Sequence, residues 1–158
     1  MDKINAERMI LIGSSERNSG KTMFAKFLIN NLKGKFPIVA LKITTIQKKG
    51  DVCPRGSGCG ACVIGGAHFI LEEETKKDSS KDTSQLLNAG ADSVFWLRSY
   101  RNFLIEAYLA FLEKIPENAL IICESNSLFE IVTPACFITI RQKQMHGNQF
   151  SILASSGG

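Results

Sequence analysis

The sequence of 158 residues lacks the features that mark membrane, secreted and nucleic-acid-binding proteins. Every apolar run is shorter than the 18 or so residues that a membrane-spanning helix needs. Residues 1–13 place acidic side chains before a short apolar run, which is not typical of a signal peptide. The 19 lysines and arginines, against 15 acidic residues, form no dense basic stripe of the kind that binds nucleic acid. We therefore expect a cytoplasmic protein with no membrane and no nucleic-acid partner.

The composition of the chain is typical of a globular protein. Apolar residues make up 44% of the chain and charged residues 22%, which is close to the average for globular proteins. The length is near that of a usual single domain. We expect one domain over residues 1–158, with a core that needs no disulfides.

Apolar runs typical of strands alternate with segments of helical periodicity. Strands are predicted at residues 9–13, 37–43, 67–71, 93–97, 119–123, 136–140 and 150–153. Helices are predicted at residues 24–32, 82–90 and 100–112. This alternation predicts an α/β fold with a mostly parallel sheet. Residues 50–66 contain six of the thirteen glycines and form a cysteine- and glycine-rich insertion within it.

A candidate phosphate-binding loop connects the first strand to the first helix. Residues 13–22 read GSSERNSGKT, and Gly20-Lys21-Thr22 matches the end of the G-x-x-x-x-G-K-[ST] motif. Backbone N–H groups at a helix N-terminus form a cradle for phosphate. Lys21 would reach the β- and γ-phosphates, and the Thr22 hydroxyl would bind Mg²⁺. The alternative is a glycine–serine turn that caps a helix.

Other residues of this loop are candidates for holding the phosphates. They are Ser15, which occupies the position of the first glycine of the motif, Arg17, Asn18, Ser19 and Gly20. An exposed loop arginine is an equally simple interpretation of Arg17.

Polar residues at strand ends could complete this site. Glu124 directly follows a predicted strand, where the second Mg²⁺ ligand of a nucleotide-hydrolysing enzyme stands. Lys42 and Thr44 end the second predicted strand and could contact phosphate or Mg²⁺, although a lysine there can also extend to solvent. Asp82 is typical of a helix N-cap, with Gln85 three residues later.

The chain resembles the molybdopterin-guanine dinucleotide biosynthesis protein B (MobB) family of P-loop nucleotide-binding proteins. Four blocks carry the resemblance: Asn18-Ser19-Gly20-Lys21-Thr22, Ala40-Leu41-Lys42, Lys81-Asp82-Thr83 with Ala89-Gly90-Ala91, and Leu120-Ile121-Ile122-Cys123-Glu124 followed by residues 136–141. The resemblance implies a P-loop NTPase-like three-layer sandwich. It also implies that Asp82 faces the nucleotide or its Mg²⁺, which leaves two interpretations of this residue.

The resemblance implies a homodimeric accessory factor for molybdenum cofactor biosynthesis or metalloenzyme maturation. Its ligands would be GTP or ATP with Mg²⁺, and its partner a nucleotidyltransferase or a molybdoenzyme. Lys21, Asp82 and Glu124 are the candidate catalytic residues, with Thr22 and Glu124 on Mg²⁺. We expect hydrolysis to be slow, because no catalytic glutamine or arginine finger is evident.

The cysteine-rich segment suggests a different kind of site. Cys53, Cys59 and Cys62 lie within ten residues, and Cys59-x-x-Cys62 is a chelating spacing. With His68 or ligands from a symmetric partner, they could bind zinc or an iron–sulfur cluster. The alternatives are free thiols or a redox pair. The competing function is therefore a metal-carrying binding module in which nucleotide is only a structural ligand.

Replacing Cys59 and Cys62 by serine tests whether the cysteines form a site of their own. We expect the double variant to lose bound zinc or iron while its nucleotide affinity stays unchanged, because the two motifs use different residues. Elemental analysis and nucleotide titration of both proteins measure this. Equal metal content in the two proteins would contradict a cysteine site.

Overall fold

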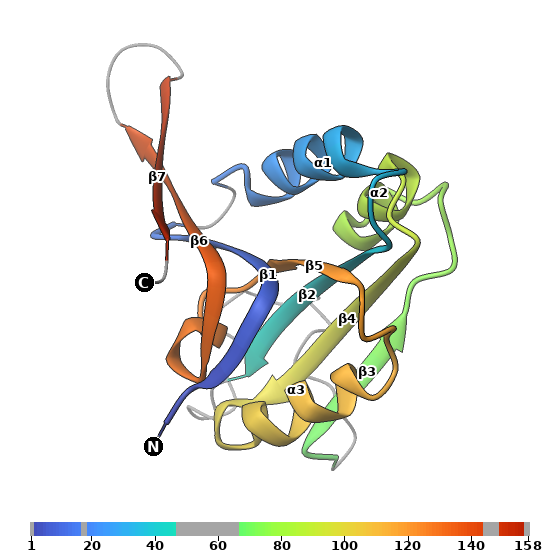
Figure 1. The fold of residues 1–158 in the computed structure, drawn as a ribbon, viewed down its shortest axis with the longest axis vertical. Helices are drawn as coiled ribbons and strands as arrows, with labels where there is room; N and C mark the ends of the chain where they lie inside the picture. The colour runs from blue at the N-terminus through green and yellow to red at the C-terminus, as the bar shows by residue number, and fades with distance from the viewer. Residues whose placement is uncertain (1, 17–18, 47–66, 144–148, 157–158) are drawn as a thin grey trace.

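A seven-stranded sheet forms the centre of the computed structural model, which describes residues 2–16, 19–46, 67–143 and 149–156 (Figure 1). The strands are β1 (Ile4–Ser14), β2 (Ile38–Ile46), β3 (Phe69–Glu73), β4 (Ser93–Tyr100), β5 (Leu120–Glu124), β6 (Val132–Lys143) and β7 (Gln149–Ser156). The helices are α1 (Lys21–Leu32), α2 (Asp82–Ala89) and α3 (Leu104–Leu112), with 3-10 turns η1 (Arg101–Phe103) and η2 (Leu128–Glu130). In these ranges no helix is long and apolar enough to cross a membrane.

The sheet is mostly parallel. Its strand order is β3-β4-β2-β5-β1-β6-β7, and only the end strands β3 and β7 run antiparallel to their neighbours. The predicted α/β fold with a mostly parallel sheet is therefore confirmed. Because β5 lies between β1 and β2, Glu124 at its end is the sheet partner of both Ile12 and Lys42. The carboxyl ends of the parallel strands meet at one edge, where ligands of such sheets bind.

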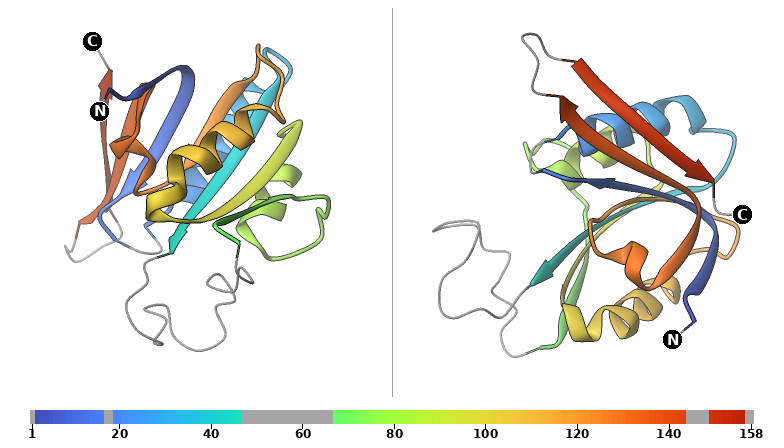
Figure 2. Two further views of the ribbon diagram at one scale, coloured as in Figure 1. Left: turned by 90° about the horizontal axis from the view of Figure 1, so that it is seen from below. Right: turned by 90° about the vertical axis from the view of Figure 1, so that its left-hand side faces the viewer.

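Helices cover both faces of the sheet, as the views along it show (Figure 2). Successive strand residues point to opposite faces. One face of β1 and β5 therefore places Ile12 and Ile122 against α1 and α2, in a core with Ile29 and Leu86. The other face packs against α3. Its core comprises, among others, Met9, Leu11, Leu41, Leu97, Tyr108 and Phe111.

The two end strands differ in their exposed side chains. β3 carries the exposed Glu72 and Glu73 in succession. β7 instead exposes Ile152 and Leu153, which are 49% and 58% accessible.

The predicted starts of the first and third helices were wrong, and so was the predicted cap of the second. The first helix begins at Lys21, three residues before the predicted start. The third helix begins at Leu104 and not at Tyr100. Tyr100 still belongs to β4, because it pairs with Ile46 of β2. The N-cap of α2 is Lys81, and no side chain caps this helix. Asp82 is the first helical residue, so the cap interpretation of Asp82 is incorrect. Gly90 ends α2 in the left-handed conformation.

The packing of α3 makes a prediction about stability. Phe111 is fully buried and meets Phe95 edge to face, with ring centroids 5.6 Å apart. We expect Phe111→Ala to lower the free energy of unfolding by about 3–5 kcal/mol, because it leaves a cavity in the core. Leu109→Ala on the same helix is the control. Since Leu109 is 46% exposed, its loss should cost less than about 1 kcal/mol. Urea denaturation of the three proteins measures both effects, and similar losses would contradict the assigned faces of α3.

Candidate functional site

The turn from β1 into α1 depends on a glycine at residue 20. Gly20 has φ 90° and ψ 16°, a left-handed conformation that strains residues with a Cβ atom. It brings Lys21 and Thr22 into the first turn of α1, and no described side chain caps this helix. The first N–H groups of a helix lack intrahelical partners and lie at the positive end of its dipole. This turn can therefore accept an anion.

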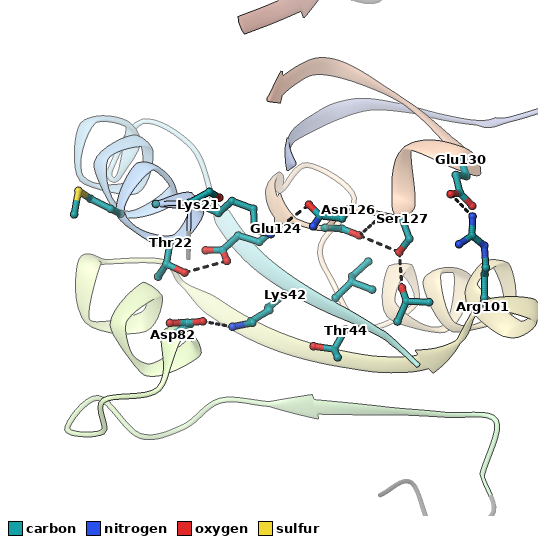
Figure 3. Close-up of a pocket in the computed structure, with 16 residues that line it drawn as sticks. Lys21, Thr22, Lys42, Thr44, Asp82, Arg101, Glu124, Asn126, Ser127 and Glu130 are labelled. Atoms are coloured by element: carbon teal, nitrogen blue, oxygen red, sulfur yellow. Dashed lines mark hydrogen bonds and ion pairs between the residues drawn. The ribbon is translucent and has the colours of Figure 1, made fainter. Parts of the chain in front are cut away.

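A pocket of about 670 Å³ opens beside this helix start, at the carboxyl edge of the parallel strands (Figure 3). Five segments converge on it: the start of α1, the end of β2, the start of α2, the start of η1 and the residues from Glu124 to Glu130. Of the predicted site residues, those that line the pocket are Ser19, Gly20, Lys21, Thr22, Lys42, Thr44, Asp82 and Glu124. The pocket therefore brings residues of the loop motif together with polar residues from strand and helix ends.

The Lys21 ammonium lies among oxygen atoms. Its Nζ donates to Ser14 Oγ at 3.1 Å and to Asn126 Oδ1 at 3.2 Å. Asn126 Oδ1 also accepts from the backbone N–H of Ser14 at 2.9 Å. Asn126 therefore links the end of β1, the start of α1 and the segment after β5. A phosphate oxygen could take the place of these neutral acceptors on Lys21.

Thr22 and Glu124 meet across the pocket. The Thr22 hydroxyl donates to Glu124 Oε2 at 3.1 Å. Glu124 is only 3% exposed, and its second oxygen, Oε1, has no hydrogen-bond partner in the described part of the chain. Burial raises the pKa of the Glu124 carboxyl from 4.5 to about 7, against the lowering effects of Lys42, the Thr22 hydrogen bond and Lys21. Nearby Asp82 raises the pKa further.

Lys42 and Asp82 form an ion pair between β2 and the start of α2. Both side chains are partly exposed to the pocket. Lys42 is also the sheet partner of Glu124, so one ammonium lies close to two carboxyl groups. Asp82 therefore lines the pocket.

Several other predicted residues lie outside the pocket or outside the described part of the chain. Ser15 is exposed and is not among the described residues that line the pocket. Arg17, Asn18, Cys53, Cys59 and Cys62 lie outside the described residues. The His68 ring stacks on Phe103, with centroids 3.7 Å apart.

The structure also adds residues that were not predicted. They are Asn126 and Ser127 after β5, Thr45 on β2, and Arg101 and Glu130 in the 3-10 turns. Asn126 and Ser127 had a signal in the sequence, because the polar stretch Glu124-Ser125-Asn126-Ser127 follows a buried strand. Arg101 had none, since it fell within a segment predicted to be helical.

The donor set fits a magnesium ion. Mg²⁺ prefers oxygen ligands and is commonly held by one or two protein groups plus phosphate and water. The Thr22 hydroxyl and the buried, unpaired Glu124 Oε1 are such oxygens. In the described ranges no group of three or more His, Cys, Asp or Glu side chains could hold a metal by itself. A cation here would depend on further oxygens from a ligand or from water.

Comparison of the chain with protein-family models, curated proteins and solved structures gave no significant match.

The raised pKa of Glu124 predicts a pH dependence of stability in the absence of nucleotide and Mg²⁺. Between pH 4.5 and 7, Glu124 is protonated in the folded chain but ionised in the unfolded chain, so it makes stability fall as the pH rises. This rise in the pKa corresponds to a total loss of about 3 kcal/mol, which is complete by about pH 8.

Glu124→Gln removes this titration and preserves the shape of the side chain. We expect wild type to lose about 2.5 kcal/mol more than Glu124→Gln between about pH 5 and about pH 8 in urea denaturation. Titrating groups that do not interact with Glu124 contribute equally to both proteins. Parallel pH profiles would show that Glu124 is already ionised in the folded chain.

Proposed function

We propose that this chain is a P-loop nucleotide-binding protein that binds Mg²⁺ with GTP or ATP and hydrolyses it slowly. In this proposal the α/β fold is a P-loop NTPase-like three-layer sandwich. The observation that carries the proposal is the hydrogen bond between Thr22 and Glu124, beside a helix start that requires Gly20. The motif and the acidic strand end come from distant parts of the sequence, and their side chains meet.

The contacts support a separate role for each residue. The backbone at the start of α1 would hold the phosphates, and Lys21 would exchange Ser14 and Asn126 for phosphate oxygens. Thr22 and Glu124 would hold Mg²⁺. When bound, this ion would neutralise negative charge on the phosphates. Lys42 would approach the terminal phosphate from β2.

Slow hydrolysis follows from the charges at the site. Glu124 accepts from Thr22 through one oxygen and would use the other for Mg²⁺, and Asp82 is paired with Lys42, so neither carboxylate would be free to orient water in this arrangement. If Lys42 moves to a phosphate, Asp82 becomes the better placed of the two to hold a water molecule.

The wider role rests on the resemblance to the MobB family. It is that of a homodimeric accessory factor in molybdenum cofactor biosynthesis or metalloenzyme maturation, with a nucleotidyltransferase or a molybdoenzyme as partner. A cytoplasmic location is part of this proposal.

Titration calorimetry with GTP and ATP, with and without Mg²⁺, tests the proposal. We expect wild type to bind one or both nucleotides in a Mg²⁺-dependent manner. Lys21→Ala should weaken binding by about 10- to 100-fold, since it removes charge-assisted hydrogen bonds. Thr22→Val should remove most of the Mg²⁺ dependence, because it replaces the metal-binding hydroxyl by a methyl group.

The exposed Lys35→Ala is the matched control for loss of positive charge and should bind like wild type. Wild-type protein that binds neither nucleotide would overturn the proposal. Equal weakening by Lys21→Ala and Lys35→Ala would show that binding depends on net charge and not on the loop.

A further inference from the structure

The pocket extends well beyond the residues assigned to phosphate and Mg²⁺. Figure 3 shows Arg101 and Glu130 on the opposite side of the pocket from Lys21 and Thr22, with Ser127 and Thr44 between them. We call the part lined by Thr44, Thr45, Ser127, Arg101 and Glu130 the distal lobe. It lies past Glu124 and Lys42, on the side where the terminal phosphate would be.

Hydroxyl groups held in fixed positions line the distal lobe. Thr44 is buried, and its Oγ1 accepts from the Trp96 indole N–H at 3.0 Å. The hydroxyls of Thr45 and Ser127 contact each other and connect β2 to the segment after β5. Ser125 fixes that segment, because its Oγ accepts from the N–H groups of Ser127 at 3.2 Å and of Leu128 at 3.1 Å.

A charged pair borders the same lobe. Arg101 in η1 is ion-paired with Glu130 in η2, and both side chains are partly exposed. The guanidinium group has five N–H donors in a planar fork that suits phosphate and carboxylate, and Glu130 engages only one of its terminal nitrogens. An anion in the lobe could therefore bind Arg101.

The chemistry of the distal lobe is unsuited to a nucleotide base. The five residues that line it include no aromatic ring and no large apolar side chain. Hydroxyls and an arginine match a small hydroxylated molecule that carries an anionic group.

We propose that the distal lobe is a subsite for a second ligand, a small hydroxylated molecule with one phosphate or carboxylate group, which binds beside the terminal phosphate of the nucleotide. Arg101 binds its anionic group, and the hydroxyls of Thr45 and Ser127 bind its hydroxyl groups. The position of the nucleotide in this proposal rests on the proposed function.

The chain contains its own probe for this subsite. Trp96 is the only tryptophan, and it donates to Thr44 in the distal lobe. The protein is first saturated with a fluorescent, non-hydrolysable Mg²⁺–nucleotide analogue and then titrated with glycerol 3-phosphate, glycerate or glycerol. The fluorescence of Trp96 reports on the distal lobe, and the fluorescence of the analogue reports on the bound nucleotide. We expect a saturable Trp96 response to glycerol 3-phosphate or glycerate, no response to glycerol, and retention of the nucleotide.

Three variants separate ligand binding from structural effects. Arg101→Ala should weaken binding of the anion about tenfold or more, with nucleotide affinity unchanged. Glu130→Ala also breaks the ion pair but leaves Arg101 in place, so it should bind the anion as well as wild type or better. Arg141→Ala removes an exposed arginine on β6 and should have no effect.

The possible failures are distinct. Nucleotide binding without a saturable anion response, displacement of the nucleotide by the anion, or wild-type anion affinity in Arg101→Ala would each overturn the subsite and leave the proposed function standing. Equal losses in Arg101→Ala and Glu130→Ala would assign Arg101 a structural role. Failure of the fluorescent nucleotide to bind would overturn the proposed function itself.

Discussion

The insertion of β5 between β1 and β2 is the constraint on which the candidate site depends. Parallel pairing on both sides fixes Glu124 opposite Ile12 and Lys42. The buried carboxyl group then meets Thr22 on α1 from one direction and lies close to Lys42 from the other. A shift of β5 by one residue would turn Glu124 to the opposite face of the sheet, towards α3, and separate it from Thr22.

The charges around Glu124 form a partly compensated group. Lys21 and Lys42 stabilise the ionised form of the buried carboxyl group, whereas Asp82 destabilises it. In the absence of ligand, the cations are held by protein oxygens: Lys21 by Ser14 and Asn126, and Lys42 by Asp82. These contacts keep the ammonium groups in the pocket, so an incoming polyphosphate would meet positioned donors and would exchange partners with them.

Much of the fold follows from local patterns, because central strands of a parallel sheet are apolar along their whole length. The element ends are less predictable. The first half of β1 carries the exposed Glu7 and Arg8 and joins the sheet through β6, so its apolar run reveals only the second half. Lys21, Thr22 and Glu124 were predictable from a motif and from the rule for strand ends. Asn126 belongs to the polar stretch after β5 and was predictable in the same way, whereas the position of Arg101 depends on the spatial order of the strands, which no local pattern encodes.

The difference between the two end strands has a consequence for association of the chain. An end strand presents unpaired backbone groups that can add a strand from another molecule. On β3, the successive glutamates Glu72 and Glu73 oppose such addition by charge. The described side chains of β7 are uncharged, and Ile152 and Leu153 are exposed among them. Addition of a strand from another molecule is therefore disfavoured at β3. Among the described side chains of β7 no charge opposes it, so we expect self-association of the sheet to occur at β7 and not at β3.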